Sequence, residues 1–346
     1  MGAAAGYKVG PILSAARSAA IGVGPNPGRA APGVILVSMN LPVLVVHGPA
    51  IPGCPLVLDS PHSGFLMPPD FVSVRTVAEL RDGEDCFIDE LYLPATARGV
   101  PLLAAQFPRT YIDANRHAGD IDLELLDEPW PDGPVPYTPS GKARIGKALV
   151  WRTLDDGRPL YNRKLSVAEV QQRTRRCHRP YHLQLKALLD AAHARFGVAY
   201  HLNCHSMNAV SGSVSANPGE GGAGVPRADF VLGDRDGTTC APVFTAFVRD
   251  VLLGLGYEVK VNDPFKGVEL VRAFGDPAAG RHSLQLEVNK RLYIDSTTLT
   301  RHKGYDTLQA HLMLLIDAII QYITDHPTDH PIPEARHARH AHPAAD

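Results

Sequence analysis

The sequence of 346 residues has almost no excess of charge of either sign, because 34 lysines and arginines stand against 36 aspartates and glutamates. A near-neutral total is not typical of proteins that bind nucleic acids or membrane surfaces through their charge. The sequence also lacks an uncharged apolar run of the roughly 18 residues that a membrane span needs. We therefore expect neither a nucleic-acid partner nor a membrane.

Cysteine is scarce as well. The five cysteines are an odd number, are widely spaced and include no Cys-x-x-Cys pair. This pattern argues against a disulfide framework and against a zinc site built from thiolates. Unpaired cysteines are typical of a reducing compartment, so we expect a cytoplasmic protein.

The two ends of the chain have few of the residues that build a core. The first acidic residue is Asp59, and the start of the chain is rich in Ala, Gly, Ser and Pro. This composition is similar to a transit peptide, but we interpret residues 1–45 as a disordered or wrongly assigned extension, with Met39 as the alternative start. Residues 326–346 hold five of the 16 histidines and predict a flexible tail. Residues 46–325 then form a single catalytic domain.

Between these ends, strand-like and helix-like stretches alternate, with an irregular insertion rich in Asp, Gly and Pro at 117–165. The apolar patterns predict strands at 55–60, 102–106, 111–113, 199–204, 229–232, 258–261 and 283–289, and helices at 76–98, 166–196, 242–255 and 302–324. This alternation predicts an α/β fold with a mixed, largely parallel central sheet and helices on both faces. In such sheets, functional sites gather where strands reach their carboxyl ends.

Two histidines each follow or end a predicted strand. His62 stands in a Pro-His-Ser-Gly sequence, and His205 in an Asn-Cys-His-Ser sequence. Neutral imidazoles at two strand ends are suitable ligands for zinc or another divalent metal. The alternative is that each ring only caps its strand by hydrogen bonding.

Acidic residues that could complete such a site lie in two places. Asp85 and Asp89 are four residues apart in the predicted helix and share one face, which could equally be a solvated acidic face. Glu287 alternates with the apolar residues of its strand and so lies on the opposite face. A carboxylate on a buried face needs a cation, a metal or a water molecule as partner. The alternative for Glu287 is a half-exposed edge strand.

Basic side chains and one asparagine could also belong to such a site. Arg109, Asn115 and Arg116 surround a predicted strand end, and an arginine fork binds carboxylates with two hydrogen bonds. Arg109 could instead form a structural pair with a neighbouring aspartate. Lys266 and Arg272 add positive charge near a turn that contains Gly and Pro.

A serine or cysteine nucleophile is disfavoured. The sequence has no Gly-x-Ser-x-Gly elbow. Cys204-His205 and His62-Ser63 are neighbours in sequence, and side chains of neighbours on a strand point apart, so neither pair makes a nucleophile and its base.

Seven short motifs, taken in order, resemble the N-formylglutamate amidohydrolase family over about residues 55–320. They are Pro61-His62-Ser63-Gly64, Asp85 with Asp89-Glu90-Leu91-Tyr92, Arg109 with Asp113-Ala114-Asn115-Arg116, His205-Ser206-Met207, Val231-Leu232-Gly233-Asp234-Arg235-Asp236-Gly237, Asn262-Asp263-Pro264-Phe265-Lys266-Gly267 and Leu284-Gln285-Leu286-Glu287-Val288-Asn289. The family is in turn similar to zinc carboxypeptidases and aspartoacylase. Their fold and their order of His, acidic ligand, Asn-Arg, His and Glu are therefore expected here. In those relatives a Glu stands three residues after the first His, and Phe65 takes that place in this sequence.

The resemblance implies hydrolysis of N-formyl-L-glutamate to formate and L-glutamate, a step of histidine degradation. It implies Zn²⁺ or another divalent metal held by His62, Asp85 and His205, with Asp89 as the alternative carboxylate. Glu287 is then the general base, and Arg109 helps to stabilise the oxyanion.

The substrate is expected to be a small acyl-amino acid, whose carboxylates would bind Asn115 and Arg116 on one side and Lys266 or Arg272 on the other. Three other functions stay open: a related zinc N-acyl-amino-acid deacylase, a small-peptide carboxypeptidase, and a non-catalytic ligand-binding protein. The sequence predicts no oligomeric state.

Overall fold

The computed structural model describes residues 42–131, 140–212 and 222–326. The predicted N-terminal extension up to residue 41 and the predicted tail from residue 327 lie outside the described residues. Within the described part, a seven-stranded sheet forms the centre. Its strands are β1 (Leu44–His47), β2 (Leu56–Ser60), β3 (Leu102–Ala105), β4 (Ala199–Met207), β5 (Phe230–Gly233), β6 (Val259–Val261) and β7 (Arg281–Asn289), in the order β1-β3-β2-β4-β7-β5-β6.

The sheet is mixed and largely parallel, as the alternation of elements predicts. β2 pairs in parallel with β3 and β4, β4 pairs in parallel with β7, and β5 pairs in parallel with β6. Only β1 with β3 and β5 with β7 are antiparallel. The carboxyl ends of β2, β4 and β7 therefore meet at one edge, in the middle of the sheet. β7 lies between two other strands, which excludes the edge-strand alternative for Glu287.

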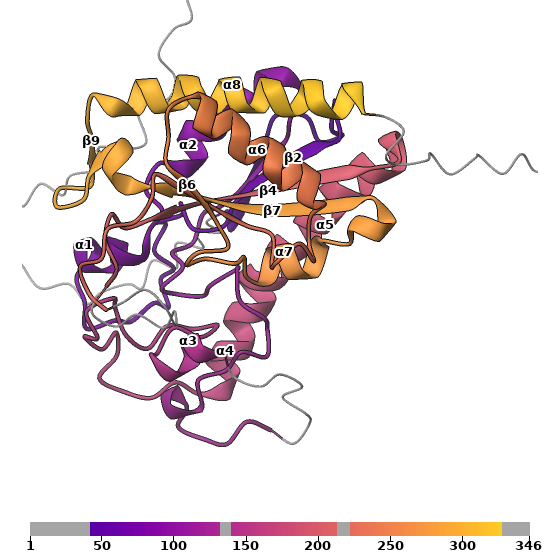
Figure 1. Ribbon diagram of the computed structural model, residues 1–346. Coiled ribbons are helices and arrows are strands. Elements are labelled where there is room, and N and C mark those ends of the chain that lie inside the picture. Colours follow the sequence, from indigo (N-terminus) through magenta and orange to yellow (C-terminus); the bar gives the residue numbers. More distant parts are fainter. Residues whose placement is uncertain (1–41, 132–139, 213–221, 327–346) are drawn as a thin grey trace, which may run out of the picture. The chain divides into compact units, whose positions relative to one another are not determined.

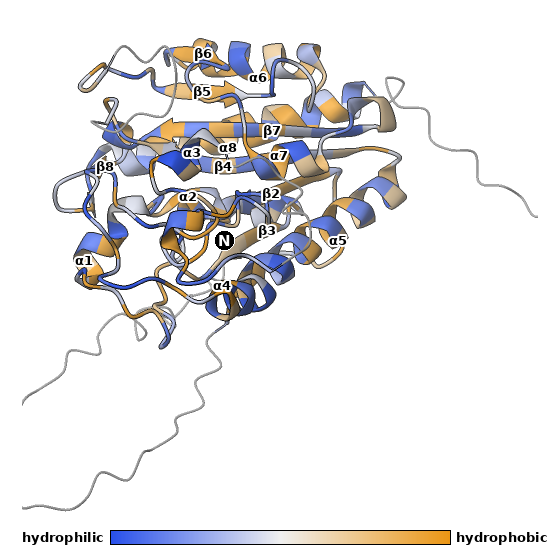
Figure 2. Cartoon of the chain, turned by 90° about the horizontal axis from the view of Figure 1, so that it is seen from below, coloured by the Kyte–Doolittle hydropathy of each residue, from blue (hydrophilic) through white to orange (hydrophobic). Residues whose placement is uncertain are grey.

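Helices cover both faces of this sheet (Figure 1). The core on one face includes residues of α2 (Ile88–Tyr92), α6 (Pro242–Gly254) and α8 (Gly304–Asp325). The core on the other face includes residues of α4 (Val167–Arg173), α5 (Arg179–Phe196) and α7 (Glu269–Phe274). Even-numbered apolar residues of β7 point to the first face, so that its odd-numbered polar residues point to the second. Figure 2 shows hydrophobic and hydrophilic residues alternating along β7.

Among the described residues, one helix, α8, is long and apolar enough to cross a membrane by length and composition alone. Its buried residues include Leu312, Leu315, Ile316 and Ile319, which belong to the core on the first face of the sheet. Core helices of soluble domains pass the same test of length and composition, so α8 is explained by its packing.

The helix expected over 76–98 is broken. It forms α1 (Val77–Leu80), a 3₁₀ turn at Arg81–Gly83, α2 and a second 3₁₀ turn at Leu93–Arg98. Phe87 has a left-handed backbone with φ of 63°, which a helix interior does not permit. The break turns residues 84–87 away from a helical path and lets Asp85 reach the sheet edge.

The prediction of a strand at 111–113 is wrong. Tyr111 N–H donates to the Pro108 carbonyl, and the Asp113 side chain accepts from the Asn115 N–H, so the segment consists of turns. The helix expected over 166–196 begins with the predicted capping box at Ser166 and is interrupted by a π-helical turn at Thr174–His178, directly before Pro180. The sequence also did not predict β1, α3 (Gly141–Arg144), α7 or the small hairpin of β8 (Ile294–Asp295) and β9 (Thr300–Arg301).

Candidate metal centre

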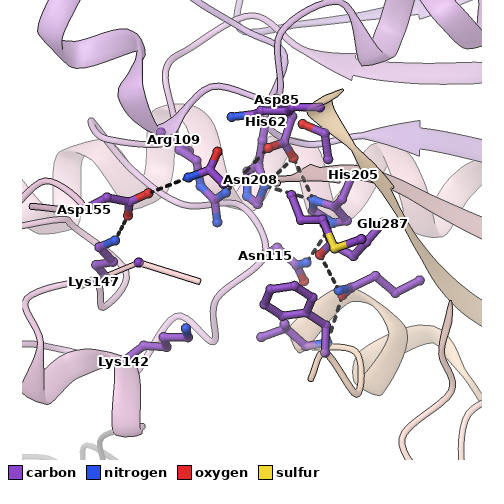
Figure 3. A pocket seen from close by; sticks show the side chains of 18 of the residues that line it. His62, Asp85, Arg109, Asn115, Lys142, Lys147, Asp155, His205, Asn208 and Glu287 are labelled. Carbon is purple, nitrogen blue, oxygen red and sulfur yellow. Dashed lines mark hydrogen bonds and ion pairs between the residues drawn. The ribbon is translucent and has the colours of Figure 1, made fainter. Parts of the chain in front are cut away.

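The residues that could carry chemistry gather at the carboxyl edge of the three central parallel strands. His62 lies two residues after β2, His205 belongs to β4, and Glu287 of β7 is the direct register partner of His205. Asp85 reaches the same point from the loop before α2. These four side chains line a cavity of about 170 Å³, and Figure 3 shows them side by side.

The segment after His62 has a demanding local structure. A Cβ on Gly64 would lie only 2.4 Å from the carbonyl carbon of Gln106, so no larger residue fits against that backbone. The Ser63 hydroxyl donates to the Asp85 carbonyl at 3.1 Å and accepts from the Asp89 N–H at 3.2 Å. The Asp85 N–H also donates to the His62 carbonyl at 3.0 Å. These bonds tie the loop that carries His62 to the loop that carries Asp85.

Three ligand atoms form a compact triangle. Nδ1 of His62 lies 3.1 Å from Nδ1 of His205 and 3.4 Å from Oδ2 of Asp85, and the last two atoms are 3.0 Å apart. The three side chains are at most 3% exposed. We call these three residues the ligand triangle. It is a group that could bind a metal ion.

The other ring nitrogen of His62 and of His205, Nε2, already has a hydrogen-bond partner in the protein. His62 Nε2 lies 2.7 Å from Oδ1 of the buried Asp113, and His205 Nε2 lies 2.8 Å from Oδ1 of Asn203. Both partners are acceptors, so both Nε2 atoms carry a proton. Each neutral ring therefore directs the lone pair of Nδ1 at the other. This arrangement is unfavourable unless a positive charge lies between the rings, and it therefore fits a bound cation.

Charges in the site point in the same direction. Burial raises the pKa of Asp85, but when no metal is bound a proton on the imidazoles supplies the positive charge: hydrogen bonds from His205 and His62 and the charges of His62 and Arg109 hold the pKa well below its usual value. Burial lowers the pKa of His205, and the hydrogen bond to Asp85 and the charge of Glu287 raise it above its usual value. The lowered pKa keeps Asp85 ionised, and the raised pKa of His205 reflects the carboxylates of Asp85 and Glu287 beside it, so the site offers anionic oxygen to a bound cation.

Glu287 has the opposite tendency. Burial is the main cause that raises its pKa; the charge of Asp85 adds to this, and the charge of His205 partly offsets it. Its Oε1 accepts a hydrogen bond from Gln285 at 2.9 Å. Glu287 is outside the ligand triangle, so it is a carboxylate that is ready to accept a proton at the wall of the cavity.

Arg109 bridges two buried carboxylates. Its Nη2 lies 3.0 Å from Oδ2 of Asp113, and its Nη1 lies 3.8 Å from Oδ1 of Asp85. The predicted structural pair with Asp113 is therefore present, and the guanidinium also lines the cavity. Its Nε is buried and has no hydrogen-bond partner. Both roles expected for Arg109 are compatible with this position.

Asn115 and Arg116 also line the cavity. Asn115 Nδ2 lies 3.0 Å from His205 Nε2. Arg116 donates to the backbone carbonyls of Lys147 and Asn115 at 3.1 and 3.0 Å. The two hydrogen bonds of Arg116 therefore hold its guanidinium against the backbone beside the cavity.

The structure does not bring Lys266 and Arg272 to this cavity. Lys266 is exposed and pairs with Asp236 at 2.9 Å, and Arg272 pairs with Glu269 at 2.7 Å. Both lie outside the cavity lining. The alternative ligand Asp89 is also outside the ligand triangle, and burial raises its pKa to about 6.

Sequence reasoning missed several residues of the cavity. Trp151 lies between Arg109, 5.0 Å from the ring centre, and Lys147, 4.9 Å from it. Lys147 pairs with Asp155, and Figure 3 shows this pair and Lys142 across the cavity from Glu287. These residues come from the irregular insertion, whose sequence has no periodicity to indicate which side chains turn inward. Arg227 and Lys290 complete the set of basic residues in the lining.

Comparison with known proteins shows the family of this chain. A family model described as N-formylglutamate amidohydrolase matches residues 54–294. A protein of Pseudomonas putida named N-formylglutamate deformylase is 30% identical over 248 residues, which cover 70% of this chain and 83% of the relative. A relative of the same name from Pseudomonas aeruginosa is 31% identical over 246 residues, covering 70% and 82%.

Two solved structures are similar. The crystal structure of N-formylglutamate amidohydrolase from Ralstonia eutropha JMP134 has a TM-score of 0.75 and 44% sequence identity, and covers 82% of this chain and 98% of its own. A protein from Agrobacterium tumefaciens has a TM-score of 0.57 at 15% identity, with coverage of 82% and 96%, and supports the fold alone.

Proposed function

This chain belongs to the N-formylglutamate amidohydrolase family, and we propose that it hydrolyses N-formyl-L-glutamate to formate and L-glutamate with the help of a divalent metal. Water supplies the oxygen that forms the new bond to the formyl carbon. The bond between this carbon and the nitrogen then breaks, and the nitrogen leaves as the amine of glutamate. The proposed substrate rests on the names of the relatives, and the proposed metal-dependent mechanism rests on the ligand triangle.

The ligand triangle fits a small divalent ion such as zinc. Nitrogen and oxygen ligands about 2.0–2.2 Å from a tetrahedral zinc ion lie roughly 3.3–3.6 Å apart. The three separations of 3.0, 3.1 and 3.4 Å are close to that range. Three protein ligands of this type leave one position for water or substrate, as is typical of hydrolytic sites. A metal ion held by His62, Asp85 and His205 would polarise the formyl carbonyl and acidify a water molecule.

Glu287 is the proposed general base and acid. It lies opposite His205 in the strand register and lines the cavity. Its raised pKa makes the carboxylate a better proton acceptor near neutral pH than an ordinary glutamate. It takes the proton of the attacking water and returns it to the leaving amine. Arg109, whose side chain lines the cavity, would support the negative charge that develops on the formyl oxygen.

Basic residues of the cavity bind the two carboxylates of the substrate. The lining holds Arg109, Arg116, Lys142, Lys147, Arg227 and Lys290 against three acidic residues, Asp85, Asp155 and Glu287. A protein with a formal net charge of −2 can therefore still bind a dianion. The cavity of about 170 Å³ is smaller than typical drug-sized pockets of roughly 300 Å³ or more, which suits a small amino-acid derivative.

Lys290 is the strongest candidate for an anchor. It is 5% exposed and lines the cavity. Within the described ranges, no hydrogen bond or ion pair joins its side chain to another residue. Its Nζ is not among the buried side-chain atoms that lack a hydrogen-bond partner, so the ammonium is accessible from the cavity, where the carboxylate of a bound substrate would pair with it.

The experiment is a comparison of purified protein on N-formyl-, N-acetyl- and peptidyl-glutamate, before and after treatment with a chelator. We expect hydrolysis of the formyl compound to be fastest and to depend on metal. Preference for acetyl-glutamate would favour the related deacylase, and preference for peptidyl-glutamate the carboxypeptidase. Binding of glutamate without turnover of any of the three would favour a binding protein.

A further inference from the structure

A line of buried polar side chains runs from the ligand triangle across the three central strands. Asp59 of β2, His201 and Asn203 of β4 and Ser283 of β7 are each at most 2% exposed. Asp59, His201 and Ser283 are linked by hydrogen bonds of 2.8 and 2.7 Å. None of the four belongs to the cavity lining among the described residues, so they do not touch the substrate. Buried polar groups that are fully hydrogen-bonded fix each other's orientation.

Asp59 determines which way the amide of Asn203 points. Asp59 Oδ1 lies 2.7 Å from Asn203 Nδ2, and Tyr181 donates its hydroxyl proton to Oδ2 at 2.8 Å. Burial raises the pKa of Asp59, but the charge of His201 and hydrogen bonds from His201, Asn203 and Tyr181 hold it below its usual value. An ionised carboxylate can only accept hydrogen bonds. Asn203 must therefore turn its NH₂ group to Asp59 and its oxygen away from it.

Asn203 in turn determines which nitrogen of His205 carries the proton. The Asn203 oxygen lies 2.8 Å from His205 Nε2, so this nitrogen must donate. Asn115 Nδ2 is also near, but the Asn115 oxygen accepts from the Leu270 N–H at 2.8 Å, so the amide of Asn115 cannot turn over and act as acceptor. With its proton on Nε2, the neutral ring presents the lone pair of Nδ1 to the ligand triangle.

We propose that Asp59 is a positioning residue of the metal centre, which acts through Asn203 to set the tautomer of His205. Asp113 sets the tautomer of His62 in the same way but directly, because its Oδ1 lies 2.7 Å from His62 Nε2. The inference rests on the proposed metal-dependent function, because the tautomer matters only if Nδ1 of His205 binds a metal. Mutation of a residue that hydrogen-bonds a metal-bound histidine typically weakens metal affinity about 10–100-fold.

The first test is the affinity of Asp59→Asn for Co²⁺ or Zn²⁺, measured in competition with a chelating indicator. The change keeps the shape of the side chain and removes the charge that orients Asn203. We expect affinity about 10–100-fold weaker than in the unchanged protein. Tyr181→Phe is the matched control, because it removes a hydrogen bond from the other oxygen of Asp59. Its affinity should stay unchanged.

The double variant Asp59→Asn/Asn203→Asp tests the direction of the link. It places a donor at position 59 and an obligatory acceptor opposite His205 Nε2, so it should recover most of the affinity lost by Asp59→Asn. Unchanged affinity in a folded Asp59→Asn variant would overturn the inference. A double variant that binds metal no better than the single variant would do the same.

A measurement on the unchanged protein covers the case in which Asp59→Asn does not fold. Long-range ¹H–¹⁵N spectra of the metal-free protein, recorded where the ring is neutral, should show the proton of His205 on Nε2. A proton on Nδ1 would overturn the inference. Metal binding without hydrolysis of N-formylglutamate would instead refute the proposed function and leave the role of Asp59 intact.

Discussion

The Nδ1 atoms of His62 and His205 lie 3.1 Å apart, although both rings direct the proton of their other nitrogen to a buried acceptor. Two lone pairs at this distance repel each other unless a cation is bound between them. The oxygen of Asp85 completes the group at 3.0 Å from His205. The proposed chemistry depends on this relationship, and each prediction below tests one part of it or of the protein around it.

Glu287→Gln should reduce kcat about 100-fold or more, because the amide cannot accept the proton of the attacking water. Metal affinity should change little, since Glu287 is outside the ligand triangle. Steady-state kinetics and metal titration of the same preparation measure both. Glu269→Gln is the matched control, because Glu269 is also buried but pairs with Arg272 away from the cavity. Near-normal turnover in Glu287→Gln would remove it as the base.

Lys290→Met should raise KM for N-formylglutamate about tenfold or more, because the substrate carboxylate loses a charged partner worth roughly 1.5–3 kcal/mol. Lys266→Met is the control and should leave KM unchanged, since Lys266 is exposed and pairs with Asp236. The reverse result, a raised KM only in the Lys266 variant, would mean that Lys266 binds the substrate carboxylate, as the sequence predicts, and that Lys290 does not.

Gly64→Ala should destabilise the fold by about 1–3 kcal/mol, because its Cβ would overlap the backbone of Gln106. The shift should also disturb His62, two residues earlier, and weaken metal binding. Denaturant unfolding measures the first effect. Gly254→Ala is the control: nothing lies within 4 Å of its added Cβ, and at the last residue of α6 it should not destabilise, with a gain of at most about 0.5 kcal/mol. Equal stability of the Gly64 variant and the unchanged protein would contradict the packing argument.

Acid should destabilise the protein through His178. Burial is the main cause that lowers the pKa of His178 to about 3, and the charge of the stacked His182 adds to it. Below about pH 6.5, His178 binds a proton in the unfolded chain but stays neutral in the folded chain until the pH approaches 3. Stability is therefore lost as the pH falls from about 6.5 towards 3, by about 1.4 kcal/mol per pH unit.

Unfolding free energies of the unchanged protein and His178→Gln at about pH 7 and pH 5 test this linkage. Glutamine can keep the hydrogen bond to the Arg116 carbonyl, which His178 makes at 2.8 Å, and it cannot titrate. The variant should lose less stability between the two pH values. Parallel losses in both proteins would mean that other groups carry the acid sensitivity.

Much of the site could be predicted from the sequence, because its residues are attached to strands. Period-2 alternation places Glu287 on the polar face of β7, and the ends of apolar runs place His62 and His205 at one sheet edge. These signals are local. The parallel pairing of β2 with β4 and of β4 with β7 then brings these three residues together.

The rest depends on contacts that no local pattern encodes. The choice between Asp85 and Asp89 is made by the left-handed turn at Phe87, which breaks the expected helix. Lys266 looked suitable beside its turn but pairs with Asp236, whereas Lys290 follows a strand without any motif of its own. Side chains of the irregular insertion are positioned by tertiary packing alone, as Trp151 is between Arg109 and Lys147.

The metal content of the purified protein tests the central claim most directly. We expect one divalent ion per chain, loss of N-formylglutamate hydrolysis on chelation, and recovery when Zn²⁺ or a similar ion is added back. His62→Ala and His205→Ala should each abolish stoichiometric binding in a folded protein. A protein that contains no such ion and keeps its full activity in the presence of a chelator would contradict the account.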